Sequence, residues 1–316
     1  MENNELIKQC TEKAQTWLTA AYDAETQAEV KAMLENPDKT DLIDAFYKDL
    51  EFGTGGLRGI MGAGSNRMNI YTVGAATQGL ANYLNKCFAG KKDISVVVGH
   101  DCRNNSRKFA EISADIFTAN GIKVYLFEDM RPTPEMSFAI RHLGCQSGIN
   151  ITASHNPKEY NGYKVYGPDG GQLPPDAADV VVAAIDSYDI FDDVKFISLD
   201  EAKEKGLLEI VSSDLDEKFL DVVQTQQQNP EAVAEVADTF KLIYTPFHGT
   251  GSRPIKAILN RMGFKNVLVV KEQDTEDGNF PTVKSPNPED KEGFEIAIKM
   301  AKENDVDVII GTDPDC

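Results

Sequence analysis

The stretch that decides the fold class is Ile94–Phe127, which reads ISVVVGHDCRNNSRKFAEISADIFTANGIKVYLF. It begins with the β-branched run Ile94–Val98, continues with a helical pattern over Asn105–Ala119 and ends with a second apolar run, Ile122–Phe127. A strand, a helix and a strand in this order form a crossover unit, because two parallel strands need a long connection. The stretch therefore predicts an α/β protein with a largely parallel sheet.

The same alternation continues along the chain. A helix over Pro134–Leu143 and a strand over Gly148–Thr152 follow directly. A second series of expected strands and helices comprises Lys241–Thr245, Arg253–Arg261, Asn266–Val270, Pro288–Glu303 and Val306–Ile310. An acidic stretch, Asp186–Asp214, lies between the two series. We therefore expect two consecutive α/β domains with mixed, largely parallel sheets, divided near Ser212, close to the end of this stretch.

The first fifty residues have a helical pattern instead. Their apolar residues recur at three- and four-residue steps and form one stripe, which consists of Leu6, Ile7, Cys10, Ala14, Trp17, Leu18 and Ala21. The expected organisation is a helical extension over residues 1–50, a first α/β domain over 51–212 and a second over 213–316.

Composition and charge exclude several classes of partner. The 316 residues carry 32 basic and 51 acidic side chains, a net charge of −19, which argues against nucleic acid or an anionic membrane as the partner. No apolar run is long enough to span a bilayer, and the first residues lack the pattern of a secretory signal. The five cysteines form no C-x-x-C pair, as is typical of reduced thiols. We expect a cytoplasmic protein.

A glycine-rich loop, Phe52–Gly59, is the first candidate for ligand binding. Its four glycines allow unusual backbone conformations and leave N–H groups free to face an anion, with Arg58 as a bidentate partner. On the pattern alone, an ordinary surface turn is the more frequent explanation.

The polar loop Thr152–Pro157 comes directly after the expected strand Gly148–Thr152, at the edge of the sheet where ligands bind in α/β proteins. Asn161-Gly162 predicts a tight turn, and the resulting hairpin would bring Lys164 beside Ser154 and His155. The alternative is a polar loop without chemistry. A serine hydrolase has little support, because the sequence contains no G-x-S-x-G motif.

Two aspartates, Asp313 and Asp315, follow the expected strand Val306–Ile310. Alternate carboxylates at a strand end can converge on a hard cation such as Mg²⁺, which prefers oxygen ligands. A solvated acidic turn is the alternative.

Taken together, these loops resemble those of a known family. Thr152–Pro157 with Tyr160–Lys164 resembles the phosphoserine loop of the α-D-phosphohexomutases, the phosphoglucomutase/phosphomannomutase superfamily. Other stretches that match the family in order are Phe52–Gly59, Pro132–Pro134, Thr245–Gly251, Phe280–Glu289 and Gly311–Asp315. The helical extension and Met61–Gly64 resemble the branch that includes phosphopentomutase-like phosphoglucomutases.

The resemblance implies roles for individual residues. Ser154 matches the serine that carries the catalytic phosphate, and with Asp313 and Asp315 it would bind Mg²⁺. Lys164 matches a general acid/base, and His155 lines the same catalytic site. Arg58 and Asn156 would contact the phosphate and the substrate.

The implied reaction interconverts a hexose 1-phosphate and a hexose 6-phosphate through a phosphoserine, with glucose 1,6-bisphosphate as intermediate and activator. Glucose is the favoured sugar, and mannose and pentose phosphates are the next candidates. The phosphosugar is the expected partner, and the sequence indicates no oligomeric state.

The resemblance also implies a departure from the family pattern. That pattern has a third aspartate and an arginine just beyond the position of Cys316, followed by two further domains. We therefore expect the sequence to correspond to the front part of a mutase, and the isolated 316-residue chain to have little or no turnover. A metal-dependent glycosyltransferase and a non-catalytic phosphosugar-binding protein are the alternatives.

Overall fold

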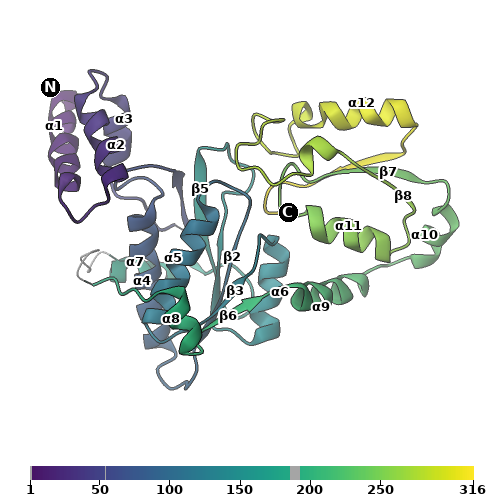
Figure 1. The fold of residues 1–316 in the computed structure, drawn as a ribbon, viewed down its shortest axis with the longest axis horizontal. Helices are drawn as coiled ribbons and strands as arrows, with labels where there is room; N and C mark the ends of the chain where they lie inside the picture. The colour runs from purple at the N-terminus through teal and green to yellow at the C-terminus, as the bar shows by residue number, and fades with distance from the viewer. Residues whose placement is uncertain (1, 54, 186–192) are drawn as a thin grey trace.

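The computed structural model of the protein describes residues 2–53, 55–185 and 193–316. It contains a helical extension, a six-stranded sheet with its helices and a three-stranded sheet with its helices (Figure 1). This confirms the predicted α/β class. Thr54 of the glycine-rich loop and residues 186–192 of the acidic stretch lie outside the described residues.

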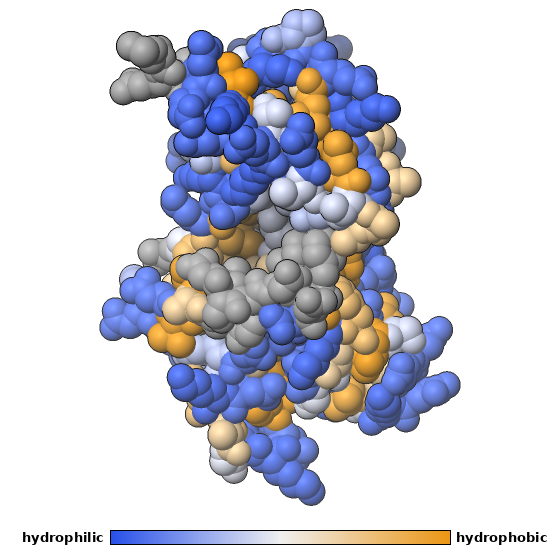
Figure 2. All heavy atoms as spheres, turned by 90° about the vertical axis from the view of Figure 1, so that its left-hand side faces the viewer, coloured by the Kyte–Doolittle hydropathy of each residue, from blue (hydrophilic) through white to orange (hydrophobic). Residues whose placement is uncertain are grey.

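The helical extension consists of α1 (Glu2–Gln15), α2 (Ala24–Glu35) and α3 (Thr40–Phe46), with a 3₁₀ turn at Thr16–Leu18. Its members bury a small core around Trp17, whose ring stacks on Tyr22 at a centroid distance of 4.5 Å. The predicted apolar stripe is correct through Trp17. Beyond it the prediction is wrong, because the helix ends at Gln15 and Leu18 is exposed. The outer face of this extension is largely hydrophilic (Figure 2).

The six-stranded sheet has the order β1-β5-β4-β2-β3-β6. Its strands are β1 (Gly56–Ile60), β2 (Ser95–His100), β3 (Lys123–Phe127), β4 (Ser147–Ile151), β5 (Tyr160–Tyr166) and β6 (Leu208–Val211). The pairs β2/β3, β2/β4 and β3/β6 are parallel, whereas β5 runs antiparallel to both β1 and β4. The sheet is therefore mixed and largely parallel, as predicted.

Helices cover both faces of this sheet. One face packs against α4 (Ile70–Cys87), α5 (Ser106–Ala119), α7 (Pro175–Ile185) and α8 (Leu199–Glu204). The other face packs against α6 (Thr133–Leu143) and the start of α9 (Ser213–Gln224). The alternation of strand side chains explains the two layers, since Val96 and Val98 point to the first core and Val97 points to the second.

The three-stranded sheet is parallel throughout, with the order β8-β7-β9. Its strands are β7 (Lys241–Thr245), β8 (Asn266–Val269) and β9 (Val308–Gly311). The helices of this region are α10 (Pro230–Val236), α11 (Ser252–Arg261) and α12 (Glu295–Asn304), with 3₁₀ turns at Lys271–Gln273 and Lys291–Phe294. α11 packs against one face and α12 against the other (Figure 1). The predicted helix Pro288–Glu303 thus starts later than expected.

The predicted tight turn at Asn161-Gly162 is wrong, although the predicted hairpin exists. Both residues lie inside β5, and the connection from β4 is the eight-residue loop Thr152–Glu159. Gly162 is required there because a Cβ atom at this position would lie 2.5 Å from the carbonyl oxygen of Thr152. The glycine therefore marks a close approach of two backbones and not a turn.

In the described ranges, no helix is long and apolar enough to cross a membrane.

Candidate functional site

Two loops, one from each sheet, meet at the carboxyl ends of their strands. The serine loop, Thr152–Glu159, follows β4, and the carboxylate loop, Thr312–Cys316, follows β9. Oγ of Ser154 donates a hydrogen bond of 2.6 Å to Oδ2 of Asp313. Because ligands of open α/β sheets bind beyond the carboxyl ends of strands, this contact marks a candidate site.

A partly buried lysine contacts the carboxylate loop as well. Nζ of Lys164, on β5, donates to Oδ2 of Asp315 at 2.6 Å, and the two side chains are 16% and 6% exposed. Oγ1 of Thr133, at the start of α6, donates to the same carboxylate oxygen at 3.0 Å. The backbone N–H of Thr133 also donates to the carbonyl oxygen of Asp315, at 2.8 Å. The carboxylate loop is thus fixed against the first sheet.

The two aspartates differ in their protonation equilibria. Burial and the neighbouring charge of Asp315 raise the pKa of Asp313 to about 6. Burial also disfavours the charged form of Asp315, but the ammonium group of Lys164 outweighs this effect and lowers the pKa of that carboxyl group. Two carboxylates so close together repel each other, and a cation between them would remove this repulsion.

The donor set around Ser154 suits a hard divalent cation. Ser154, Asp313 and Asp315 offer oxygen atoms alone, which are the ligands that Mg²⁺ prefers. Across the part of the chain that the structure describes, no cluster of three or more His, Cys, Asp or Glu side chains has the arrangement of a metal site. The chemistry of these three oxygen donors is compatible with a magnesium ion, which would take its remaining ligands from water or phosphate.

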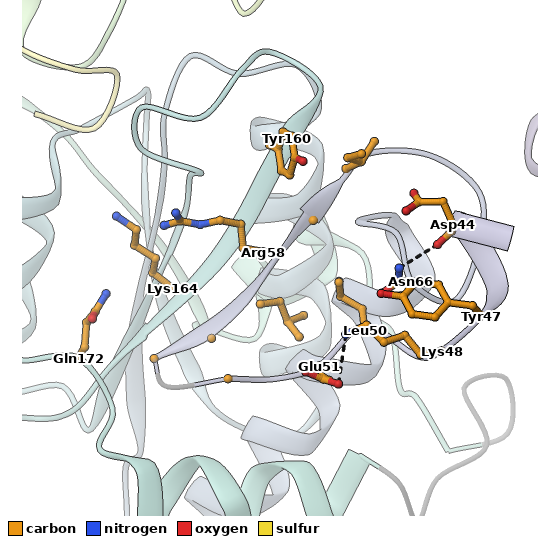
Figure 3. Close-up of a pocket in the computed structure, with 16 residues that line it drawn as sticks. Asp44, Tyr47, Lys48, Leu50, Glu51, Arg58, Asn66, Tyr160, Lys164 and Gln172 are labelled. Atoms are coloured by element: carbon orange, nitrogen blue, oxygen red, sulfur yellow. Dashed lines mark hydrogen bonds and ion pairs between the residues drawn. The ribbon is translucent and has the colours of Figure 1, made fainter. Parts of the chain in front are cut away.

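A cavity of about 510 Å³ lies beside this cluster, along β1. Arg58 and Lys164 both line it and extend in the same direction (Figure 3). Asp44 and Tyr47, which belong to the helical extension, lie on the other side of the view (Figure 3). Nη1 of Arg58 donates to Oδ1 of Asn156 at 3.1 Å, which ties the glycine-rich loop to the serine loop. The predicted anion-binding residues are therefore neighbours of Lys164.

His155 is placed differently from the other predicted residues. It is exposed, and within the described ranges its imidazole makes no hydrogen bond or ion pair, while its backbone oxygen accepts a hydrogen bond of 3.0 Å from Oγ of Ser285. Ser154 and Lys164 thus both reach the carboxylate loop, whereas among the described residues the imidazole of His155 has no hydrogen bond or ion pair with it.

The loop Thr245–Gly251 packs against the carboxylate loop. The backbone N–H of Thr250 donates to the carbonyl oxygen of Pro314 at 3.0 Å, and the hydroxyls of Tyr244 and Thr312 are 2.9 Å apart. A Cβ atom at Gly249 would lie 2.4 Å from Cα of Pro314, so the two backbones need a glycine at this point. This motif therefore acts through packing.

Sequence analysis missed two residues of the site, Thr133 and Arg103. Thr133 stands between two prolines in the stretch Pro132–Pro134, which carried the resemblance but received no role. Arg103 follows β2, at the same edge of the sheet as the serine loop. Its position after a parallel strand was the signal that could have identified it.

Comparisons with known proteins identify the family. The model of phosphoglucomutase/phosphomannomutase α/β/α domain I matches residues 49–190, and the model of domain II matches residues 217–316. A phosphoglucomutase from Staphylococcus haemolyticus is 41% identical over 271 residues, which are 85% of this chain and 48% of that protein. A probable phosphoribomutase from Schizosaccharomyces pombe is 34% identical over 308 residues, 95% of this chain and 51% of that protein. The chain spans about half the length of the curated relatives it matches.

The fold is shared with solved structures. A putative phosphomannomutase from Thermus thermophilus superposes with a TM-score of 0.69 at 23% identity, over 85% of this chain and 55% of that chain. A phosphoglucomutase/phosphomannomutase family protein from Burkholderia thailandensis gives a TM-score of 0.63 at 21% identity, over 84% of this chain and 52% of that chain. The chain therefore belongs to the α-D-phosphohexomutases, the phosphoglucomutase/phosphomannomutase superfamily, and matches its domains I and II.

Proposed function

We propose that the protein is a phosphosugar mutase that interconverts hexose 1-phosphate and hexose 6-phosphate through phosphorylated Ser154. The observation that carries this proposal is the contact of Ser154 with Asp313, beside the Lys164–Asp315 ion pair, in a chain of this family. Glucose is the proposed sugar, since relatives up to 41% identical are named phosphoglucomutase. Glucose 1,6-bisphosphate is the proposed intermediate.

The proposed chemistry has two balanced transfers. In the first, the bond between phosphorus and Oγ of Ser154 breaks, and a bond forms from phosphorus to a hydroxyl oxygen of the sugar phosphate. Lys164, as the neutral amine, takes up the proton of that hydroxyl, and Oγ of Ser154 leaves as the alkoxide that attacks in the second transfer. The bisphosphate then turns around and returns its other phosphoryl group to Ser154, and Lys164 gives the proton back to the sugar oxygen that is released. Phosphoryl transfer depends on positioning and charge neutralisation, which this set of side chains supplies.

The remaining residues would bind and orient. Arg58 and Asn156, linked to each other, are proposed to contact the phosphate, and exposed His155 is proposed to contact the substrate. Ser154, Asp313 and Asp315 would hold Mg²⁺. When bound, the ion supplies positive charge to the oxygens of the transferring phosphoryl group.

A pentose phosphate is the second candidate substrate. The Schizosaccharomyces pombe relative is named a probable phosphoribomutase and covers 95% of this chain. The proposed chemistry of Ser154 is the same for both sugars. The glycosyltransferase alternative gives no role to the serine loop, whereas a non-catalytic phosphosugar-binding protein keeps the fold and is separated by the experiment below.

The proposal also divides the chain into an extension, residues 1–50, a domain over 51–212 and a domain over 213–316. It is supported by the strands, because the six-stranded sheet ends at Val211 and the three-stranded sheet begins at Lys241. We propose a cytoplasmic location, supported by five cysteines that are all free thiols.

Transfer to Ser154 can be tested on the 316-residue chain itself. The protein is incubated with Mg²⁺ and glucose 1,6-bisphosphate, and in parallel with ribose 1,5-bisphosphate. Intact-mass spectrometry then measures the addition of one phosphoryl group, and peptide mapping locates it. We expect phosphoserine at Ser154 with the preferred bisphosphate, and none in the Ser154→Ala variant.

A Ser198→Ala variant is the matched control, because it removes an exposed hydroxyl at the start of α8 and leaves Ser154 and its contacts in place. No phosphoserine with either bisphosphate would contradict the mutase proposal and favour the binding protein. Turnover is then measured by a coupled assay for glucose 6-phosphate, on this chain and on a fusion to the second half of the Staphylococcus haemolyticus relative.

A further inference from the structure

The backbone of the serine loop is held from behind by one guanidinium group. Nη2 of Arg103 donates to the carbonyl oxygens of Ser154 at 2.5 Å and Asn156 at 2.6 Å. Nη1 donates to the carbonyl oxygens of Pro157 at 2.9 Å and Tyr160 at 3.1 Å. Four acceptors within seven residues thus share the planar fork of a single arginine.

The arginine is itself fixed in place. Nε of Arg103 lies 3.2 Å from Oδ2 of Asp101, and both side chains are 0% exposed. Oδ1 of Asp101 accepts hydrogen bonds from the backbone N–H of Arg103 at 2.8 Å and from Oγ of Ser106 at 2.7 Å. The ion pair follows directly after β2, in the middle of the six-stranded sheet. It therefore links the serine loop to a buried central strand of this sheet.

The loop needs such a support because of the conformation of Ser154. This residue has φ +55°, in the left-handed region that residues other than glycine rarely adopt. A conformation of this kind persists where the surrounding structure dictates it. Here the bonds from Arg103 on both sides of His155 fix the path of the chain and leave Oγ of Ser154 directed at Asp313.

The second region, which contains the three-stranded sheet, packs against the same arginine. The guanidinium carbon of Arg103 lies 5.1 Å from the ring centroid of Phe280. A Cβ atom at Gly278 would lie 2.4 Å from the backbone nitrogen of Asn104, so this segment lies directly on the turn after β2. The carbonyl oxygen of His155 accepts its hydrogen bond from Ser285, in the same part of the second region. Both regions therefore converge on the carbonyl groups of the serine loop.

We infer that Arg103 is a positioning residue, which sets the direction of the Ser154 hydroxyl toward the carboxylate loop without contacting the substrate. The inference rests on the proposed function in so far as Ser154 is the phosphorylated residue. A lysine cannot replace Arg103, because one ammonium group has three donors and lacks the fork that spans the loop carbonyls.

The experiment compares the wild-type chain with Arg103→Lys in the phosphorylation of Ser154 by glucose 1,6-bisphosphate and Mg²⁺. We expect the rate of phosphoserine formation to fall about 100-fold, as a misplacement of about 1 Å does in other enzymes. The dissociation constant for glucose 1-phosphate, measured by calorimetry, should stay near the wild-type value. Phe280→Leu should lower the rate by about fivefold, because it removes one cation–π contact.

Arg67→Lys is the matched control. Arg67 is also nearly buried and bridges two carboxylates, but these are Asp41 and Asp44 of the helical extension, at 2.7 and 2.8 Å. Both arginine variants should lose thermal stability. Only Arg103→Lys should slow the formation of phosphoserine at Ser154. Equal rates of phosphoserine formation in the two variants would overturn the inference.

A readout without activity separates this inference from the proposed function. Amide hydrogen exchange is measured for the peptide that covers the serine loop. Exchange there should become faster in Arg103→Lys and stay unchanged in Arg67→Lys. If wild-type Ser154 accepts no phosphate, the proposed function fails. The hydrogen exchange of the serine loop still tests whether Arg103 positions that loop. Unchanged exchange of the loop in Arg103→Lys would overturn its positioning role in either case.

Discussion

The two sheets each supply one half of the candidate site, but they support it differently. Every residue of β4 is buried, and β2 is buried except at its first residue. In the second sheet, the central strand β7 is buried except at its first residue, but all residues of β8 are partly exposed, and those of β9 alternate between exposed and partly exposed. Arg103, which is buried, donates to three carbonyl groups of the serine loop and to that of Tyr160. The carboxylate loop is held by Thr250 and by two residues of the first region, Thr133 and Lys164.

The difference follows from what each half must do. Ser154 has an unfavourable backbone conformation, which needs well-packed surroundings, and the buried strands β2 and β4 provide them. Asp313 and Asp315 have to share a small volume next to Ser154, and Lys164 of the first sheet holds Asp315 there. A residue of the first sheet therefore positions the carboxylate loop of the second.

The largest effect is expected from breaking the link between the two halves. Lys164→Met should slow phosphorylation of Ser154 by about 10²- to 10⁴-fold, because it removes the proposed proton-transfer group and the partner of Asp315. The rate is measured by intact-mass spectrometry at saturating Mg²⁺. Lys123→Met is the matched control, since Lys123 on β3 also pairs with a carboxylate, Glu209, at 2.7 Å. A Lys164→Met variant that matches this control would exclude the lysine from the reaction.

The core of the six-stranded sheet should show the next largest effect. Phe117 of α5 is fully buried among the residues that cover this sheet. Phe117→Ala should lower the free energy of unfolding by about 3–5 kcal/mol, because it removes a large apolar side chain and leaves a cavity. Urea denaturation measures the change. A loss below about 1 kcal/mol would mean that this core is no better packed than the second sheet.

The junction of the two regions should respond to pH. Burial, together with a hydrogen bond and the charge from Asp216, raises the pKa of Glu135 to about 8, and its side chain is 1% exposed. Between the ordinary pKa of 4.5 and about 8, the folded chain keeps a proton that the unfolded chain releases. The free energy of unfolding therefore falls as the pH rises through this range. The pKa of Asp216 is lowered, so this group is ionised in both states there and adds no slope.

Glu135→Gln should remove this dependence. The variant should be more stable than wild type at pH 8.5 by about 1–3 kcal/mol and should differ little from it at pH 4.5. Urea denaturation of both proteins at the two pH values provides the comparison. Parallel pH profiles would contradict the assignment of a protonated Glu135 to the folded chain.

The smallest effect is expected at the edge of the second sheet. Val308 of β9 is 38% exposed. Val308→Thr keeps the β-branched shape and should change the free energy of unfolding by less than about 0.5 kcal/mol. Val97→Thr, at a fully buried position of β2, is the comparison and should be clearly more destabilising. Similar losses at both positions would contradict the difference between the sheets.

The elements of both regions could be predicted because they obey local rules. The β-branched runs around Val96 and Ile243 are strands at the predicted places, and the apolar periodicity of α5 and α11 gives helices within one residue of prediction at either end. Local rules failed at Asn161-Gly162, where tertiary contacts override the turn. The side-chain Nδ2 of Asn161 donates to Oγ of Ser106 at 2.9 Å and to the carbonyl oxygen of Asn104 at 3.1 Å.

The sequence by itself determined the α/β class and the residue types of the site, because periodicity and loop composition are properties of short segments. It could indicate Ser154 and Asp313 separately. Their hydrogen bond joins residues 159 positions apart, and only the tertiary structure decided it. The same holds for the contacts of Arg103 and Thr133, whose local sequences do not indicate their partners. Their partners are backbone and carboxylate oxygens that the packing of two sheets brings within reach, and this packing depends on the whole chain.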